Sequence, residues 1–188
     1  MTGTPSDPDE VLAAKAQSGD QLAFEALIRR HKVPLYRFVR SYVGETDDAY
    51  DVLQDTFISA WSALGRYDAK RSFLPWLRVI ALNKCRDYGR RQTVRRLLML
   101  AHAREITHID EAAVVDREAN AVMVESERLI RLDAAIANLP AAYKEPLLLT
   151  TVGGLSQQEA AEVLKISAKA LEMRLYRARR KLVDDLGS

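Results

Sequence analysis

Apolar residues recur every three or four positions along most of the chain, a spacing that predicts amphipathic α-helices. In the first half, helices are expected over residues 9–17, 24–42, 46–64 and 73–88. Pro34 lies inside the second of these and should kink or divide it. Partial periodicity predicts helical turns around 119–132, and two further helices follow at the C-terminal end. The pattern therefore predicts an all-α protein.

Residues 155–186 are predicted to form two helices joined by a tight turn. Ser156 and Glu159 have the spacing of a capping box, in which each side chain bonds to the backbone of the other. Ser167 is a candidate N-cap for the second helix. Lys165 stands at a turn position that often needs positive φ, where a side chain costs roughly 1 kcal/mol, so either Lys165 is strained or the turn is built differently. One face of the second helix is an apolar stripe, made of Leu171, Leu175, Ala178, Leu182 and Leu186.

The opposite face of this second helix combines basic and apolar side chains: Lys169, Met173, Tyr176, Arg177 and Arg180. A helix-turn-helix places its second helix in the DNA major groove, where cations contact phosphates and apolar groups contact thymine methyls. The alternative is a helix with a merely solvated basic side. The capping box, the short turn and the mixed face together favour DNA binding.

Two earlier helices carry polar faces of opposite charge. The helix at 46–64 places Asp48, Asp51 and Asp55 along one edge, which favours a surface for a cationic partner over acid–base chemistry. The helix that begins near Phe73 carries amide and guanidinium groups, interleaved with the aromatic residues Tyr67, Phe73 and Trp76. Aromatic rings and cations are what single-stranded nucleic acid requires. The alternative is that Phe73 and Trp76 belong to the core.

The charge is local, because 188 residues carry a formal net charge of only +2. Residues 78–104 contain eight Lys or Arg against one acid, whereas residues 105–127 contain seven acids against Arg117 alone. The single cysteine, Cys85, excludes a disulfide framework and favours a reducing cytoplasm. Three scattered histidines do not make a zinc site, and no apolar run approaches the length of a membrane span. The acidic N-terminus does not resemble a signal peptide.

Several segments, in order, resemble the bacterial sigma factors. Residues 24–43 resemble region 2.1, and residues 48–61 resemble region 2.2, in which a Gln-acid pair, here Gln54-Asp55, precedes an aromatic residue. Residues 73–88 resemble regions 2.3 and 2.4. Leu139-Pro140, residues 154–164 and residues 174–182 resemble region 4. Two such domains with a short linker are the layout of the extracytoplasmic-function (ECF, group IV) subfamily of the sigma-70 family.

The resemblance implies a division into a flexible tail (1–8), region 2 (9–96), a linker (97–130) and region 4 (131–188). It also implies three sets of contact residues. The core polymerase contact would be Asp48, Asp51, Gln54 and Asp55, on the clamp helices of the β′ subunit. The −10 set, facing the melted promoter strand, would be Phe73, Trp76, Asn83, Arg86 and Arg90. The −35 set would be Lys169, Glu172, Met173, Arg174, Tyr176, Arg177 and Arg180.

What the resemblance implies about function is promoter recognition without a catalytic centre or a cofactor. The chain would bind core RNA polymerase, with region 4 on the β flap, and favour the open complex in a stress or envelope response. An anti-sigma factor would hold it inactive. Family members commonly have a cation where Glu172 stands, so the −35 sequence is expected to be atypical. The acidic linker is either a solvated spacer or, as in the family, a segment threading the polymerase channel.

Two other classes of function would each account for part of the sequence. An autonomous helix-turn-helix regulator would act by DNA occupancy alone, and such proteins usually dimerise on two-fold operators. No free apolar helix for a dimer is evident in the sequence. A helical adaptor that binds only proteins would explain the acidic helix and leave the arginine-rich helices without a role. Nothing in the sequence supports an enzyme.

Overall fold

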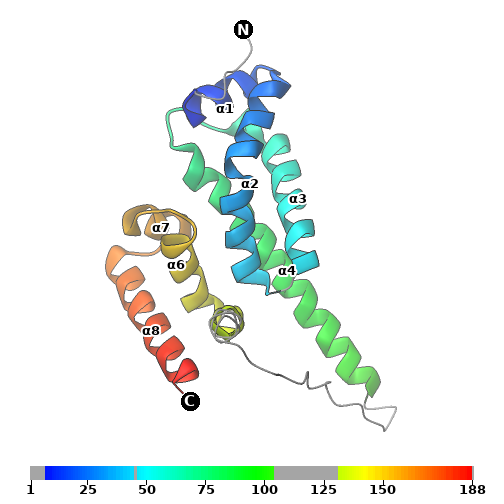
Figure 1. Ribbon diagram of the computed structural model, residues 1–188, viewed down its shortest axis with the longest axis vertical. Helices are drawn as coiled ribbons and strands as arrows, with labels where there is room; N and C mark the ends of the chain where they lie inside the picture. The colour runs from blue at the N-terminus through cyan, green and yellow to red at the C-terminus, as the bar shows by residue number, and fades with distance from the viewer. Residues whose placement is uncertain (1–6, 45, 104–130, 188) are drawn as a thin grey trace, which may run out of the picture.

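The computed structural model describes residues 7–44, 46–103 and 131–187, which are helical and contain no strand (Figure 1). The first group of helices is α1 (Asp9–Gln17), α2 (Gln21–Val43), α3 (Thr46–Ala63), the short 3-10 helix η1 (Leu64–Arg66) and α4 (Phe73–Ala103). Residues 131–138 are also helical. The second group is α6 (Ala141–Thr151), α7 (Gln157–Leu164) and α8 (Ala168–Leu186).

Helices α1 to α4 pack as a bundle, with α2 and α3 side by side and α4 crossing behind them (Figure 1). The predicted apolar stripes supply its core, and the fully buried side chains include Leu12, Leu27, Leu35, Phe38, Phe73 and Leu77. Helix α2 continues through Pro34, which is an exposed residue, so the predicted division of this helix does not occur. Gly44 ends α2 in the left-handed conformation, with φ 91°. Glycine adopts this conformation without the penalty of a Cβ.

Helices α6 to α8 form a second bundle that contains the predicted helix-turn-helix. Both halves of the capping box are present, because Ser156 Oγ accepts from Glu159 N and the Glu159 carboxylate accepts from Ser156 N. Ser167 caps α8 by accepting from Ala170 N. Lys165 adopts φ 55° at the turn, so the first of its two alternatives is correct, and it is the one non-glycine residue with positive φ in the described chain. The turn chemistry is confirmed.

The two bundles contact each other through α6 on α2 and α7 on α4. Their apolar side chains belong to one continuous cluster, which runs from Leu12 in α1 to Ala178 in α8. Charged side chains are also buried where the bundles meet, as described below. Helices α6 and α7 therefore pack directly against helices α2 and α4 in this structure.

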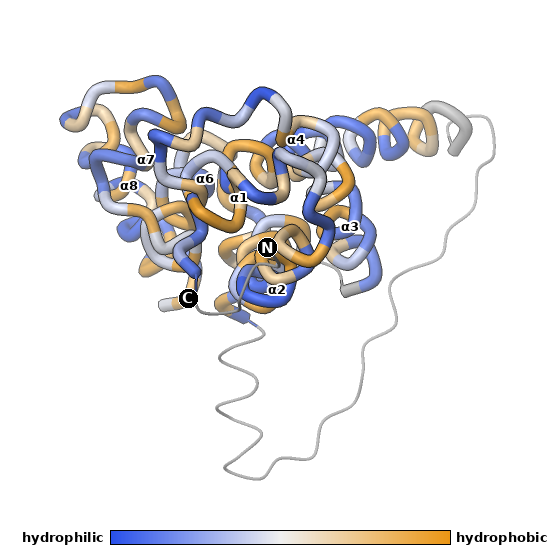
Figure 2. The backbone as a smooth tube through the Cα atoms, turned by 90° about the horizontal axis from the view of Figure 1, so that it is seen from above, coloured by the Kyte–Doolittle hydropathy of each residue, from blue (hydrophilic) through white to orange (hydrophobic). Residues whose placement is uncertain are grey.

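The C-terminal part of α4 extends away from the rest of the molecule (Figure 1). Seen from above, it carries alternating hydrophobic and hydrophilic segments without a neighbouring helix (Figure 2). Its exposed apolar residues are Val94, Leu97, Leu98, Met99 and Leu100. Helix thus continues past residue 96, where the linker was predicted to begin. The acidic segment and most of the turns predicted around 119–132 lie outside the described residues.

None of the described helices is both long enough and apolar enough to cross a membrane.

Candidate nucleic-acid and polymerase interfaces

Helix α8 presents the predicted −35 set on the side opposite its buried stripe. Leu171, Leu175 and Ala178 are buried against the rest of the bundle, which fixes the rotation of the helix. Met173 and Tyr176 are large apolar side chains that remain 45% and 59% exposed. Arg174 is half-buried at the edge of this face. The exposed members of the set are Lys169, Glu172, Met173, Tyr176, Arg177 and Arg180.

The predicted −10 set is divided by the structure into buried and exposed residues. Phe73 is only 1% exposed, so its ring cannot contact a DNA strand directly, and the alternative that it belongs to the core is correct. It packs against Trp76, with ring centroids 5.4 Å apart, and Tyr67 lies 5.0 Å from Trp76. Trp76 is half-buried on this aromatic support and lines a cleft of about 610 Å³. The cleft is also lined by Glu159 and Glu162 of α7.

The polar members of the −10 set follow one side of α4. Asn83 is exposed, and its side-chain oxygen accepts a long bond of 3.4 Å from Arg86. Arg90 pairs with Asp87 of its own helix. Arg86 donates to Glu145 of α6 through Nε at 2.8 Å and through Nη2 at 2.6 Å. This bond raises the pKa of Arg86 and ties a predicted phosphate contact to the second bundle.

Glu145 belongs to a buried polar cluster where α6 meets α2, and the sequence analysis did not identify it. Tyr42 donates to Glu145 at 3.3 Å, and burial followed by the nearby carboxylate raises the pKa of Tyr42. Lys144 donates to the carbonyls of Tyr42 and Ala137, and its pKa is lowered by burial. The available signal was a Lys-Glu-Pro sequence directly before three consecutive leucines.

Arg78 forms a second polar contact between the bundles. Its guanidinium is 2% exposed, donates from Nε to the Gly153 carbonyl at 2.9 Å, and lies over the Phe38 ring at 5.1 Å. Burial lowers the pKa of Arg78 to about 10. Within the described chain, Nη1 of Arg78 has no hydrogen-bond partner. A buried cation with incomplete hydrogen bonding therefore stands at this contact.

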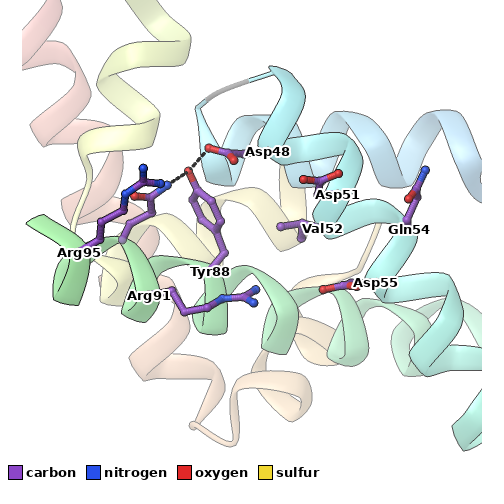
Figure 3. A pocket seen from close by; sticks show the side chains of 9 residues that line it. Asp48, Asp51, Val52, Gln54, Asp55, Tyr88, Arg91 and Arg95 are labelled. Carbon is purple, nitrogen blue, oxygen red and sulfur yellow. Dashed lines mark hydrogen bonds between the residues drawn. The ribbon is translucent and has the colours of Figure 1, made fainter.

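The predicted core polymerase contact lies on α3, where it faces the basic part of α4 across a groove of about 410 Å³ (Figure 3). Asp48 accepts a 2.5 Å bond from the Tyr88 hydroxyl, which in turn accepts from Gln92 at 2.8 Å. Asp48 is thus held within the bundle. Asp51 and Gln54 are exposed and Asp55 is half-exposed, and Arg91 and Arg95 line the opposite wall.

Exposed apolar residues continue the same surface of α3, and the sequence analysis did not include them in the contact. Tyr50, Ile58 and Trp61 are 48%, 65% and 41% exposed, and Tyr50 stacks on Tyr36 of α2. Exposed large apolar side chains beside acids are typical of a protein-binding surface. The periodicity of α3 could have shown Tyr50 and Ile58 outside the buried stripe.

Comparison with known families gives two matches in the order that the resemblance predicted. The family model of Sigma-70 region 2 matches residues 27–95, and that of Sigma-70, region 4 matches residues 129–182. The chain is 40% identical over 179 residues to the RNA polymerase sigma factor CnrH of Cupriavidus metallidurans, covering 95% of this chain and 94% of CnrH. It is 33% identical over 187 residues to the ECF RNA polymerase sigma factor SigC of Mycobacterium tuberculosis, covering 98% and 96%.

Solved structures agree with this comparison. The structure of CnrH in complex with the cytosolic domain of CnrY has a TM-score of 0.70 and 37% identity, covering 96% of this chain and 98% of that chain. The sigma factor RpoE of Bartonella quintana, crystallised with the anti-sigma factor NepR, has a TM-score of 0.63 at 22% identity and covers 87% and 96%. The second structure shows the fold alone.

Proposed function

Because this chain belongs to the extracytoplasmic-function group of the sigma-70 family, we propose that it binds core RNA polymerase and directs it to promoters with −35 and −10 elements. It contributes no catalytic step of its own. The observation that carries the proposal is the α8 face, on which cationic and apolar side chains are exposed together while the opposite stripe is buried. Duplex recognition in the major groove requires such a face.

The −35 contacts are assigned by position on α8. Met173 and Tyr176 lie near the middle of the exposed face and provide apolar surface for base edges and sugars, whereas Arg177 and Arg180 contact phosphates. Glu172 is an exposed carboxylate among these cations and can accept a hydrogen bond from cytosine N4. The −35 element is therefore expected to include a cytosine at the position read by Glu172.

The −10 strand is assigned to the side of α4 that carries Trp76, Asn83, Arg86 and Arg90. Trp76 offers a ring held by Tyr67 and Phe73, and stacking of an unpaired base on such a ring contributes about 1–3 kcal/mol. Phe73 supports this ring from the core. Arg86 becomes available to phosphate only when it leaves Glu145.

Core polymerase is assigned to the outer surface of α3. Asp51, Gln54 and Asp55 provide polar contacts to the clamp helices of β′, and Tyr50 and Ile58 provide apolar ones. Asp48 shapes this surface through its bond with Tyr88. Region 4 is assigned to the β flap. An anti-sigma factor that holds both bundles is proposed as the regulator, by analogy with CnrH, whose solved structure contains CnrY.

The test is transcription in vitro with purified core polymerase on a promoter library, with and without this chain, followed by sequencing of the transcript starts. Shared elements near −35 and −10 are expected upstream of the starts. Asp51→Lys should weaken binding to core, whereas Glu25→Lys on exposed α2 surface should not. If the chain neither binds core nor changes the starts, yet binds duplex DNA alone, it acts as an autonomous regulator and the proposal fails.

A further inference from the structure

Helix α1 contacts both ends of the segment 64–72, which consists of η1 and the residues that join it to α4 and is called the loop 64–72 below. Gln17, the last residue of α1, donates from its side-chain amide to the carbonyl of Leu64 at 2.9 Å and to that of Tyr67 at 2.7 Å. Glu10, in the first turn of α1, accepts a 3.2 Å bond from the backbone N–H of Phe73, the first residue of α4. One short helix thus holds both ends of this loop.

The loop is also closed by hydrogen bonds among its own residues. Arg71 N donates to the Asp68 carbonyl at 2.9 Å, and Lys70 N donates to the Asp68 carboxylate at 3.0 Å. The Tyr67 hydroxyl donates to the Arg71 carbonyl. A loop closed in this way moves as a unit. Its orientation relative to α4 is therefore determined by the anchors at Leu64, Tyr67 and Phe73.

Helix α1 is itself fixed firmly enough to serve as an anchor. Leu12 and Ala13 are fully buried, and Ala16 is nearly so. At its start, Asp9 pairs with Arg30, and its carboxylate accepts a 2.7 Å bond from Nε2 of His31, so α1 is tied to α2. The Gln17 and Glu10 contacts thus connect the loop to the rigid part of the bundle.

We propose that Gln17 and Glu10 are positioning residues for promoter opening, which hold the loop 64–72 and Trp76 in the arrangement that receives the unpaired −10 strand. The loop carries Tyr67, whose ring supports Trp76 at 5.0 Å, so a displaced loop would displace the stacking surface. Neither residue touches DNA in this assignment. The inference rests on the proposed function, because it assigns a role within −10 recognition.

The chemistry of Gln17 permits a precise test. An amide NH₂ has two hydrogens and can donate to both carbonyls, whereas a carboxylate of the same shape can only accept. Gln17→Glu therefore places a carboxylate, which can only accept, against the two carbonyl oxygens. Gln17→Met keeps a side chain of similar length that has no hydrogen-bond donor. Gln17→Lys restores a donor. Ser18→Ala is the matched control, because the Ser18 hydroxyl next to Gln17 donates to Ala14 within its own helix.

The experiment uses the full chain with core polymerase on a promoter found in the transcription assay, and measures open complexes by permanganate reactivity of −10 thymines. Gln17→Glu and Gln17→Met should reduce the yield of open complexes about three- to tenfold. Gln17→Lys should recover part of the yield, and Ser18→Ala should match the unchanged chain. Binding to core and to a duplex −35 probe should not change in any variant.

Two results would overturn the inference. One is an unchanged yield of open complexes with Gln17→Glu while the unchanged chain opens the promoter normally. The other is an equal loss of core binding, −35 binding and thermal stability, which would mean that Gln17 only stabilises the fold. If the unchanged chain opens no promoter at all, the proposed function has failed instead. The two failures are therefore distinguishable.

Discussion

Arg86 and Glu145 form a two-point hydrogen bond between α4 and α6, with donor–acceptor distances of 2.8 and 2.6 Å. The pair joins residues 59 positions apart and connects the two bundles. Arg86 is also the predicted contact for a −10 phosphate. The Nε–Nη2 edge of the guanidinium, which Glu145 engages, cannot bind a phosphate at the same time. The docked arrangement therefore withholds this edge of Arg86 from the promoter.

Glu145→Gln should weaken the contact between the bundles. The variant keeps the shape of the side chain and removes its charge, which should cost about 1–2 kcal/mol, given that Arg86 is 38% exposed. The reactivity of Cys85 can report this weakening. The thiol is fully buried, and its raised pKa makes it unreactive in the folded chain. Labelling of Cys85 by a thiol reagent should become about 5–30 times faster.

The matched control for Glu145→Gln is Asp185→Asn, which removes an exposed pair with Lys181 on α8. This control should leave Cys85 labelling unchanged, because exposed pairs contribute little. Equal labelling rates in Glu145→Gln and the unchanged chain would contradict a role for the Arg86–Glu145 pair in docking.

Arg180→Ala should weaken binding to duplex DNA about equally at all sequences. Arg180 is exposed on the α8 face and is assigned to a phosphate, so its loss should reduce the slope of log affinity against log salt by about 1. Fluorescence anisotropy at several salt concentrations measures this slope. Lys181→Ala removes an equal charge from the flank of the same helix and should change the slope less. Equal changes would show that only net charge matters.

His31 should make stability dependent on pH. Burial, with smaller effects of Arg78 and Arg30, lowers the pKa of His31 below its ordinary value of 6.5, although Asp9 acts in the opposite direction. Below about pH 6.5 the unfolded chain takes up a proton that the folded chain does not, so the free energy of unfolding should fall as pH falls. Urea denaturation across this range should show a smaller fall for His31→Gln. Parallel curves would exclude His31 as the cause.

Lys165→Gly should stabilise the helix-turn-helix by up to about 1 kcal/mol. The φ of 55° is unfavourable for a side chain by roughly 1–2 kcal/mol, and glycine removes this penalty while adding about 0.5–1 kcal/mol of unfolded-state entropy. The melting temperature should therefore rise by up to about 4 °C. Lys165→Val should lower it, because a β-branched residue tolerates this conformation least. A lower melting temperature for the glycine variant would contradict this account.

Local chemistry explains which features could be predicted from the sequence. The capping box of Ser156 and Glu159, the cap at Ser167 and the positive φ of Lys165 depend on residues within one turn of each other, and each was predicted correctly. The helical stripes were predicted for the same reason. Together they determine the all-α fold and the exposed face of α8.

Contacts between distant segments explain what could not be predicted. Nothing near Phe73 in sequence distinguishes a buried ring from an exposed one, because Tyr67, Trp76 and His31 surround it only in the folded chain. The partners of Arg86 and Gln17 lie 59 positions and about 50 positions away. Periodicity assigns a residue to a face of its helix and does not identify what that face contacts.

Nη1 of Arg78, which has no hydrogen-bond partner within the described residues, weakens the contact between the two bundles. A buried guanidinium with incomplete hydrogen bonding makes docking less favourable than an apolar residue of similar size would. An apolar side chain at this position would therefore shift the balance toward the docked arrangement. At position 78, incomplete bonding thus lowers the free-energy cost of separating the bundles.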